Sequence, residues 1–148
     1  MGIKFGLWFE PEMTNKDSDL YRAHPDWILH TRGRNASHGR YQYVLDFSRK
    51  EVVEYIYEMM AKILSEAKVS YIKWDMNRSI TECYSVALPA DRQGEVFHRY
   101  ILGVYDLYER LTSEFPEVLF ESCSSGGGRF DPGMLYYAPQ GWTSDDSD

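Results

Sequence analysis

The sequence predicts an α/β fold whose parallel strands form part of a (β/α)8 TIM barrel. Short apolar runs typical of buried strands alternate with longer amphipathic stretches typical of helices. Polar residues follow directly after the predicted strands, which is where (β/α)8 enzymes carry their sites. The chain has only 148 residues, whereas such a barrel needs about 250. We therefore expect about four strands from the middle of a barrel.

Two extended stretches and a long loop are predicted in the first third of the chain. Residues 4–10 form an apolar run rich in aromatic side chains that ends at a proline, which is typical of a buried strand. Residues 12–40 show little periodicity and many polar side chains, so we expect a long functional loop there. Residues 41–47 are again extended and lead into the first helix.

The middle of the chain contains two predicted helices with a strand between them. The pattern Ser48-x-x-Glu51 has the form of a capping box, which marks the start of a helix. Apolar residues at a helical spacing extend that helix from Val52 to Ala67. Residues 69–75 are a second strand candidate, and a loop follows. A second amphipathic helix is predicted to begin near Asp91, and a proline closes it.

The last third of the chain contains two further strand candidates. Residues 118–121 form the third strand, and the segment 122–128 ends in three consecutive glycines, which predicts a tight turn. Residues 141–144 are the fourth extended piece, followed by an acidic run. Strands that alternate with helices are typical of βαβ units, so we expect a parallel sheet. The chain starts in a strand and stops just after one, so we expect it to be an excerpt from a longer protein.

Composition excludes several classes of function. The chain has 16 Lys plus Arg against 23 Asp plus Glu, and its formal charge of −7 argues against a protein that binds nucleic acid. No run of about 18 apolar residues is present to span a membrane. Because the N-terminus lacks a secretory signal and two cysteines are too few for a disulfide framework, we expect a cytoplasmic protein. The aromatic content of 16% favours a site for flat sugar faces, although large aromatic side chains also fill cores.

Asp75 is the first candidate catalytic residue. It follows an apolar strand, with Lys73 two positions before it and Asn77 two positions after it. Alternate residues of a strand share a face, so the ammonium of Lys73 would hold the Asp75 carboxylate ionised while Asn77 binds a hydroxyl. An ionised carboxylate is what nucleophilic attack on a sugar anomeric carbon requires. The alternative is a simple ion pair of Lys73 with Asp75 at a strand end.

Asp145, Asp146 and Asp148 form a second group of carboxylates. Neighbouring acids do not all ionise cheaply, so we expect at least one of them to have a raised pKa and to donate a proton near neutral pH. Metal binding and a solvated acidic tail are the alternatives for this run. The spacing does not match an EF-hand loop, and the chain has neither His-x-x-x-His nor Cys-x-x-Cys. We therefore expect no metal and no cofactor.

Cys123 lies within the glycine-rich segment but lacks the signs of a nucleophile. Neither a Gly-x-Ser-x-Gly motif nor a matching Cys-His pattern is present, and the glycines lack the Lys-Ser/Thr of a phosphate-binding P-loop. We expect these glycines to let the backbone approach a ligand closely. Trp8, Trp74 and Trp142 lie at strand ends, where each either stacks on a sugar or belongs to the core.

Five segments together carry a resemblance to a known family. They are residues 6–13, 24–28, 71–78, 119–135 and 142–148. With these segments the chain resembles the catalytic barrel of glycoside hydrolase family 36, the α-galactosidases. The match covers nearly the whole chain in the right order, and the stretch Lys-Trp-Asp-Met-Asn-Arg within residues 71–78 is its most specific part.

The resemblance implies a retaining α-galactosidase that hydrolyses terminal non-reducing α-D-galactosyl residues of oligosaccharides of the raffinose or melibiose type. It implies that Asp75 is the nucleophile and Asp145 the acid/base. The implied substrate-binding residues are Trp8 as a wall of the galactose subsite, Arg40, Lys73 and Asn77 on its hydroxyls, and Cys123 with Gly126 beside the C2 hydroxyl. This last pair favours galactose over N-acetylgalactosamine.

The chain departs from the family pattern in two ways. Ser147 replaces the usual threonine, and the pair of aspartates that the family places on the preceding strand would lie before Met1. We therefore expect residues 1–148 to be a fragment of the catalytic domain, with the N-terminal β-sandwich and the remaining barrel strands outside it. A transglycosylase of the raffinose-synthase type and a non-catalytic, truncated sugar-binding fragment are the alternatives. The expected partner is an α-galactoside oligosaccharide, and the expected parent protein is a homo-oligomer.

Overall fold

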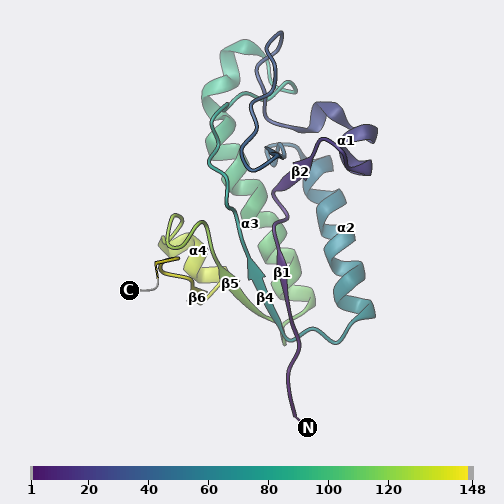
Figure 1. Ribbon diagram of the computed structural model, residues 1–148, viewed down its shortest axis with the longest axis vertical. Coiled ribbons are helices and arrows are strands. Elements are labelled where there is room, and N and C mark those ends of the chain that lie inside the picture. Colours follow the sequence, from purple (N-terminus) through teal and green to yellow (C-terminus); the bar gives the residue numbers. More distant parts are fainter. Residues whose placement is uncertain (1, 147–148) are drawn as a thin grey trace.

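The computed structural model describes residues 2–146 and contains a parallel sheet of four strands. In spatial order the strands are β1 (Gly6–Phe9), β4 (Tyr71–Trp74), β5 (Leu119–Ser122) and β6 (Gln140–Gly141). Two long helices, α2 (Lys50–Glu66) and α3 (Val96–Glu114), run side by side along this sheet (Figure 1). The predicted α/β class and the predicted parallel sheet are both confirmed.

Side-chain alternation separates a buried face of the sheet from an open face. Ile72, Trp74 and Phe120 are almost completely buried, and the Trp74 ring stacks on Tyr108 of α3 with 4.0 Å between the ring centroids. Their register neighbours Lys73 and Glu121 point to the other face, because successive side chains of a strand alternate. Burial of the apolar stripes of α2 and α3 against the sheet therefore leaves one face of the sheet free for polar side chains.

The long loop predicted for residues 12–40 contains regular structure. Its first part is β2 (Met13–Asn15), which pairs antiparallel with β3 (Gln42–Val44). Helix α1 (Asp19–Ala23) and the 3-10 turn η1 (Pro25–Trp27) follow β2, and Trp27 is buried against the ring of His24. The expectation of a loop was wrong because three-residue strands have no periodicity to read, and their pairing partner lies far along the chain.

The capping box predicted at Ser48-x-x-Glu51 does not form. Helix α2 begins at Lys50, with Arg49 at its N-cap position. The Ser48 hydroxyl and amide both donate to the buried carboxylate of Asp46, over 2.5 and 3.1 Å. Glu51 instead accepts a hydrogen bond from Arg49 Nε at 2.8 Å. The prediction was wrong because an ionisable acceptor close in space is a stronger partner for a hydroxyl than a helix amide.

Two further elements complete the described structure. The second long helix is preceded by a 3-10 turn, η2 (Ala90–Glu95), so its α-helical part starts five residues after the predicted Asp91. A short helix, α4 (Pro132–Tyr137), which the sequence did not predict, lies between β5 and β6 with Asp131 as its N-cap. Among residues 2–146, no helix is both long enough and apolar enough to cross a membrane.

Candidate active site

The candidate site lies at the end of the sheet where the carboxyl ends of the parallel strands meet. Asp75 follows β4 directly, and its carboxylate receives hydrogen bonds from three directions. Trp8 Nε1 of β1 donates to Asp75 Oδ2 at 3.1 Å, and Asn77 Nδ2 donates to the same oxygen at 2.7 Å. The backbone amide of Met76 donates to Oδ1 at 2.9 Å. Parallel strands have their carboxyl ends at the same end of the sheet, so Trp8 of β1 meets Asp75 and the two residues that follow it there.

These donors favour the ionised form of Asp75. Burial alone raises the pKa of its carboxyl, because an apolar environment disfavours charge. The hydrogen bonds from Asn77, Trp8 and the Cys123 thiol, with that from the Met76 amide, outweigh burial and bring the pKa below its usual value. Asp75 is thus a buried carboxylate that stays charged and has its orientation fixed, as a carboxylate nucleophile must be.

Lys73 does not play the part expected of it toward Asp75. Its Nζ lies 3.6 Å from Glu121 Oε1 and 3.9 Å from the centroid of the Trp142 ring. The parallel register sets Lys73 directly opposite Glu121, whereas Asp75 lies two residues, about 6.6 Å, further along the strand. The prediction that Lys73 holds Asp75 ionised was wrong, and so was the alternative of a simple ion pair between them. Hydrogen-bond donors perform that function.

Two carboxylates without a predicted role lie in β5 and directly after β1, the two strands that pair with β4. Glu121 is buried and accepts hydrogen bonds from Tyr71 and, at 2.6 Å, from Gln140 Nε2. Glu10, directly after β1, accepts a hydrogen bond from the backbone amide of Asn77 at 2.9 Å. The sequence signal for both was present: each is an acidic residue within or directly after an apolar strand, where an unpaired charge is costly.

The three tryptophans predicted at strand ends differ in exposure. Trp74 is fully buried and belongs to the core. Trp8 is 54% exposed and Trp142 is 43% exposed, so both indoles present surface to a ligand. Trp142 Nε1 also donates a hydrogen bond to Asp145 Oδ1 at 2.9 Å. The core interpretation therefore holds for Trp74, and the exposed indoles of Trp8 and Trp142 flank the two candidate catalytic aspartates.

The glycine-rich segment, residues 122–128, lies between the two aspartates. Ser125 Oγ donates to Asn77 Oδ1 at 3.3 Å, and the Gly127 amide donates to the Thr143 carbonyl at 3.1 Å. Gly126 has a φ of +82°, and a Cβ there would lie 3.1 Å from Ser144 Cα. Only glycine allows this backbone conformation and this approach without strain. The close approach in the structure is to Thr143 and Ser144 of the same chain, and the expected close approach to a ligand stays a prediction.

The remaining predicted residues lie further out. Arg40 is exposed, in the turn just before β3, and lines an open cavity together with Asn77. Asp145 is exposed, and Asp148 lies outside the described residues. The expectation that one aspartate of this run donates a proton stays a prediction. Within residues 2–146, no group of three or more His, Cys, Asp or Glu side chains is arranged to hold a metal ion.

Comparison with known proteins identifies the family. A sequence model of the melibiase family matches residues 1–148. The chain belongs to the melibiase family. The α-galactosidase AgaA of Geobacillus stearothermophilus is 58% identical to this chain over 148 residues, and the α-galactosidase Mel36A of Lactobacillus acidophilus is 56% identical over 147. The crystal structure of the GH36 enzyme AgaA matches 99% of the chain with a TM-score of 0.96.

These relatives are much longer than this chain. The chain spans 20% of the length of AgaA and 20% of the length of Mel36A. Crystal structures of AgaA variants are described as complexes with raffinose and with stachyose. The chain therefore corresponds to about one fifth of each of these α-galactosidases.

Proposed function

We propose that the chain is part of a full-length retaining α-galactosidase, which hydrolyses terminal non-reducing α-D-galactosyl residues of oligosaccharides such as raffinose. The observation that carries the proposal is the carboxylate of Asp75, which accepts hydrogen bonds from Trp8 and Asn77 at the carboxyl end of a parallel sheet. The lowered pKa of this carboxyl supports it. A second carboxylate, Asp145, lies on the segment bound to the same glycine-rich turn. Membership of the melibiase family and the raffinose and stachyose complexes of AgaA variants support this choice of substrate.

We infer that the four-stranded sheet is about half of a (β/α)8 barrel. Its strands are all parallel, and β1 and β6 stand at its two edges. Lys73 and Glu121 are polar residues on the open face, as expected of a surface that turns toward a barrel interior. Closing the barrel would pair both edges with strands from the rest of the protein. The proposed full-length protein supplies those strands and an N-terminal β-sandwich.

The proposed mechanism has two displacements at the anomeric carbon. Asp75 attacks C1 while Asp145 donates a proton to the departing glycosidic oxygen, which leaves a covalent galactosyl–Asp75 ester. Asp145 then removes a proton from a water molecule, whose oxygen attacks C1 and releases Asp75 and galactose. Two inversions give net retention. A retaining enzyme of this type needs its two carboxyl groups about 5–5.5 Å apart.

The substrate is held by side chains around Asp75. The exposed indole of Trp8 forms one wall of the galactose subsite, and Arg40, Lys73 and Asn77 bind its hydroxyls. The side-chain amide of Asn77 donates one N–H of Nδ2 to Asp75. Its contact with the sugar therefore uses the second N–H of Nδ2. Cys123 and Gly126 lie beside the C2 hydroxyl. The expected homo-oligomer and the expected cytoplasmic location stay predictions.

Product analysis of the full-length enzyme tests the proposed function. On raffinose, we expect α-galactose and sucrose as first products, detected by proton NMR before mutarotation mixes the anomers. Release of β-galactose first would show inversion and contradict the assigned roles. With sucrose in excess as the acceptor, a transglycosylase would transfer galactose to sucrose faster than it hydrolyses raffinose. A folded enzyme that binds raffinose without cleaving it would favour the sugar-binding alternative.

A Trp8→Phe variant tests which groups keep Asp75 ionised. The change keeps an aromatic wall but removes the N–H that donates to Asp75 Oδ2. Loss of a donor to the charged form raises the pKa of Asp75, and kcat/KM requires that residue ionised. We therefore expect the acid limb of the kcat/KM profile to move to higher pH. An acid limb that stays at its wild-type position would contradict this role of the Trp8 N–H.

A further inference from the structure

A buried ion pair joins two distant loops next to the proposed site. Glu12, between β1 and β2, is fully buried, and both of its carboxylate oxygens accept hydrogen bonds from Arg129 Nη1, at 2.7 and 2.8 Å. The two residues are 117 positions apart in the chain. Neither residue has a part in the two displacements of the proposed mechanism.

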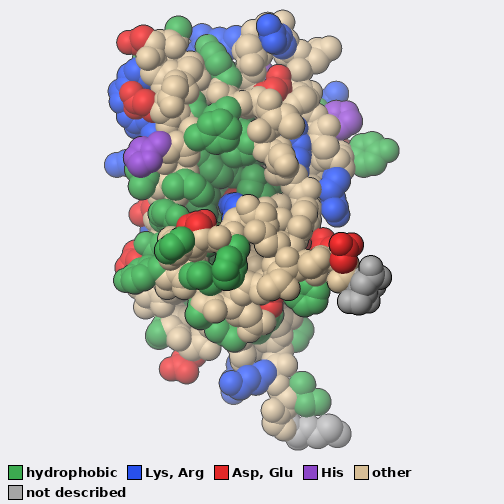
Figure 2. Space-filling model, turned by 90° about the vertical axis from the view of Figure 1, so that its left-hand side faces the viewer, with side chains coloured by type: hydrophobic (Ala, Val, Ile, Leu, Met, Phe, Trp, Pro, Cys, Tyr) green, Lys and Arg blue, Asp and Glu red, His purple; other side chains and the backbone are tan. Residues whose placement is uncertain are grey.

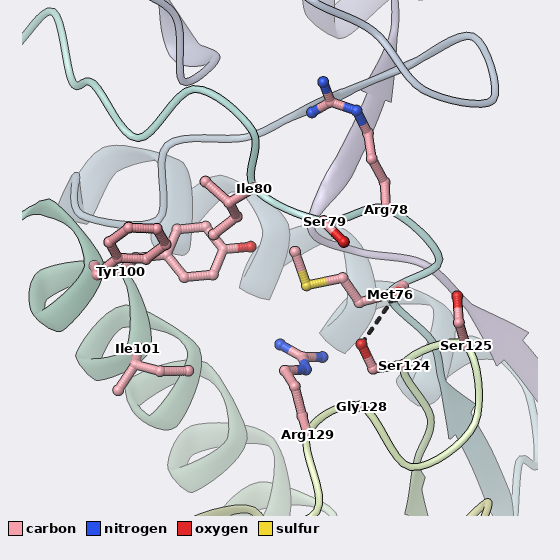
Figure 3. Close-up of a pocket in the computed structure, with 11 residues that line it drawn as sticks. Met76, Arg78, Ser79, Ile80, Tyr100, Ile101, Ser124, Ser125, Gly128 and Arg129 are labelled. Atoms are coloured by element: carbon pink, nitrogen blue, oxygen red, sulfur yellow. Dashed lines mark hydrogen bonds between the residues drawn. The ribbon is translucent and has the colours of Figure 1, made fainter. Parts of the chain in front are cut away.

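Arg129 depends on Glu12 for its hydrogen bonds. Its side chain is 14% exposed, and within residues 2–146 its buried Nε and Nη2 atoms have no hydrogen-bond partner. Figure 3 shows Arg129 extending from the loop at Gly128 into the space between Met76, Ile101 and Tyr100. Hydrophobic side chains gather over the upper part of α3 on this face of the molecule (Figure 2). In such surroundings a guanidinium stays in place chiefly because of its carboxylate partner.

Arg129 immediately follows the glycine-rich segment and so anchors its end. The segment is closed by internal hydrogen bonds from the Ser124 amide to the Gly126 carbonyl at 2.9 Å and from the Gly128 amide to the Ser124 carbonyl at 3.3 Å. Ser124 Oγ donates to the Met76 carbonyl at 3.0 Å, which is the dashed line in Figure 3. A displacement of Arg129 would therefore move the segment as one unit.

The same segment contacts both catalytic regions. Ser125 binds Asn77, which is itself a hydrogen-bond donor to Asp75. Gly127 binds the carbonyl of Thr143, two residues before Asp145. The position of the glycine-rich segment thus affects where Asp145 lies relative to Asp75.

We propose that the Glu12–Arg129 ion pair is a positioning device that sets the placement of Asp145 relative to Asp75 by anchoring the glycine-rich segment. The proposal rests on the proposed function. Charge-assisted hydrogen bonds from Arg129 Nη1 to both carboxylate oxygens of Glu12 are stronger than neutral ones and depend on direction, which apolar packing does not. A small displacement of a general acid is costly, since a misplacement of about 1 Å reduces rates by about 10²-fold.

The test compares two substrates in the full-length enzyme. Raffinose has a poor leaving group, which needs a proton from Asp145. A p-nitrophenyl α-galactoside has a good leaving group, p-nitrophenolate, which departs with little help from an acid. For Arg129→Lys and for Glu12→Gln, we expect kcat/KM on raffinose to fall about 10-fold further than kcat/KM on the aryl substrate. The matched control is Arg110→Lys, because Arg110 makes an ion pair with Glu54 at 2.9 Å between α3 and α2, away from the site. It should reduce both rates equally or not at all.

A double variant separates positioning from stability. Replacing both partners with methionine removes the ion pair without leaving a buried charge, and such replacements often leave stability unchanged. We expect Glu12→Met/Arg129→Met to melt near the wild-type temperature and to keep the larger loss on raffinose. Equal losses on both substrates, or full recovery of raffinose hydrolysis in the double variant, would overturn the proposal. A folded wild-type enzyme inactive on both substrates would instead refute the proposed function on which it rests.

Discussion

Replacing Asp75 with Ala in the full-length enzyme is expected to abolish hydrolysis of raffinose, with kcat reduced by at least about 10⁴-fold. Asp75 supplies the atom that forms the bond to C1, and every other group of the site acts on that step. Trp8, Asn77 and the Met76 amide fix the direction of the carboxylate and keep it charged. None of these donors replaces it as a nucleophile.

Azide makes this prediction specific to the nucleophile. In Asp75→Ala the missing carboxylate leaves space for a small anion on the same side of the sugar. Azide attacking C1 there displaces an activated aryl group with one inversion, so β-galactosyl azide should accumulate and aryl release should partly recover. The control is Asp91→Ala, a change in the η2 turn that should leave raffinose hydrolysis unaffected. Undiminished turnover in Asp75→Ala would refute the assigned role.

Replacing Asp145 with Ala should produce a loss that depends on the leaving group. General acid catalysis contributes about 10²–10⁴-fold, so raffinose hydrolysis should fall by that factor. An aryl substrate with an activated leaving group needs no proton, and its first step should be nearly unaffected. The second step then lacks its general base, so the galactosyl–Asp75 ester should accumulate, which intact-protein mass spectrometry detects.

Azide and a neighbouring residue distinguish this role from that of Asp75. In Asp145→Ala, azide should attack the covalent ester and give α-galactosyl azide, the opposite anomer to that expected from Asp75→Ala. The matched variant is Asp146→Ala, since Asp146 is the adjacent exposed aspartate. We expect it to lack the dependence on leaving group. If Asp146→Ala showed that dependence and Asp145→Ala did not, the acid/base role would belong to Asp146.

Local sequence patterns predicted the elements whose burial repeats along the chain. Helices α2 and α3 were predictable because apolar residues recur on one side of each, and β1, β4 and β5 because each lies in a short apolar run. The fourth strand, β6, comprises only Gln140 and Gly141, and the predicted range of residues 141–144 overlaps it at one residue. The β2–β3 ribbon was not predictable in this way. Each of its strands has three residues, and their pairing is decided by a partner more than 25 positions away. The Ser48 capping pattern failed for a related reason, because Asp46 is a better acceptor.

For the site, the sequence by itself indicated the candidate residues and the end of the sheet that they occupy. The carboxyl ends of parallel strands lie at the same end of the sheet, which brings together Asp75, Asn77, Cys123 and Trp8. The alternation of strands and helices along the chain predicts this parallel arrangement. Only the tertiary structure decided how their charges are balanced. Strand register pairs Lys73 with Glu121 and leaves Asp75 to neutral donors, and chain packing joins Glu12 to Arg129. Register and packing depend on contacts between residues remote in sequence, which no local pattern contains.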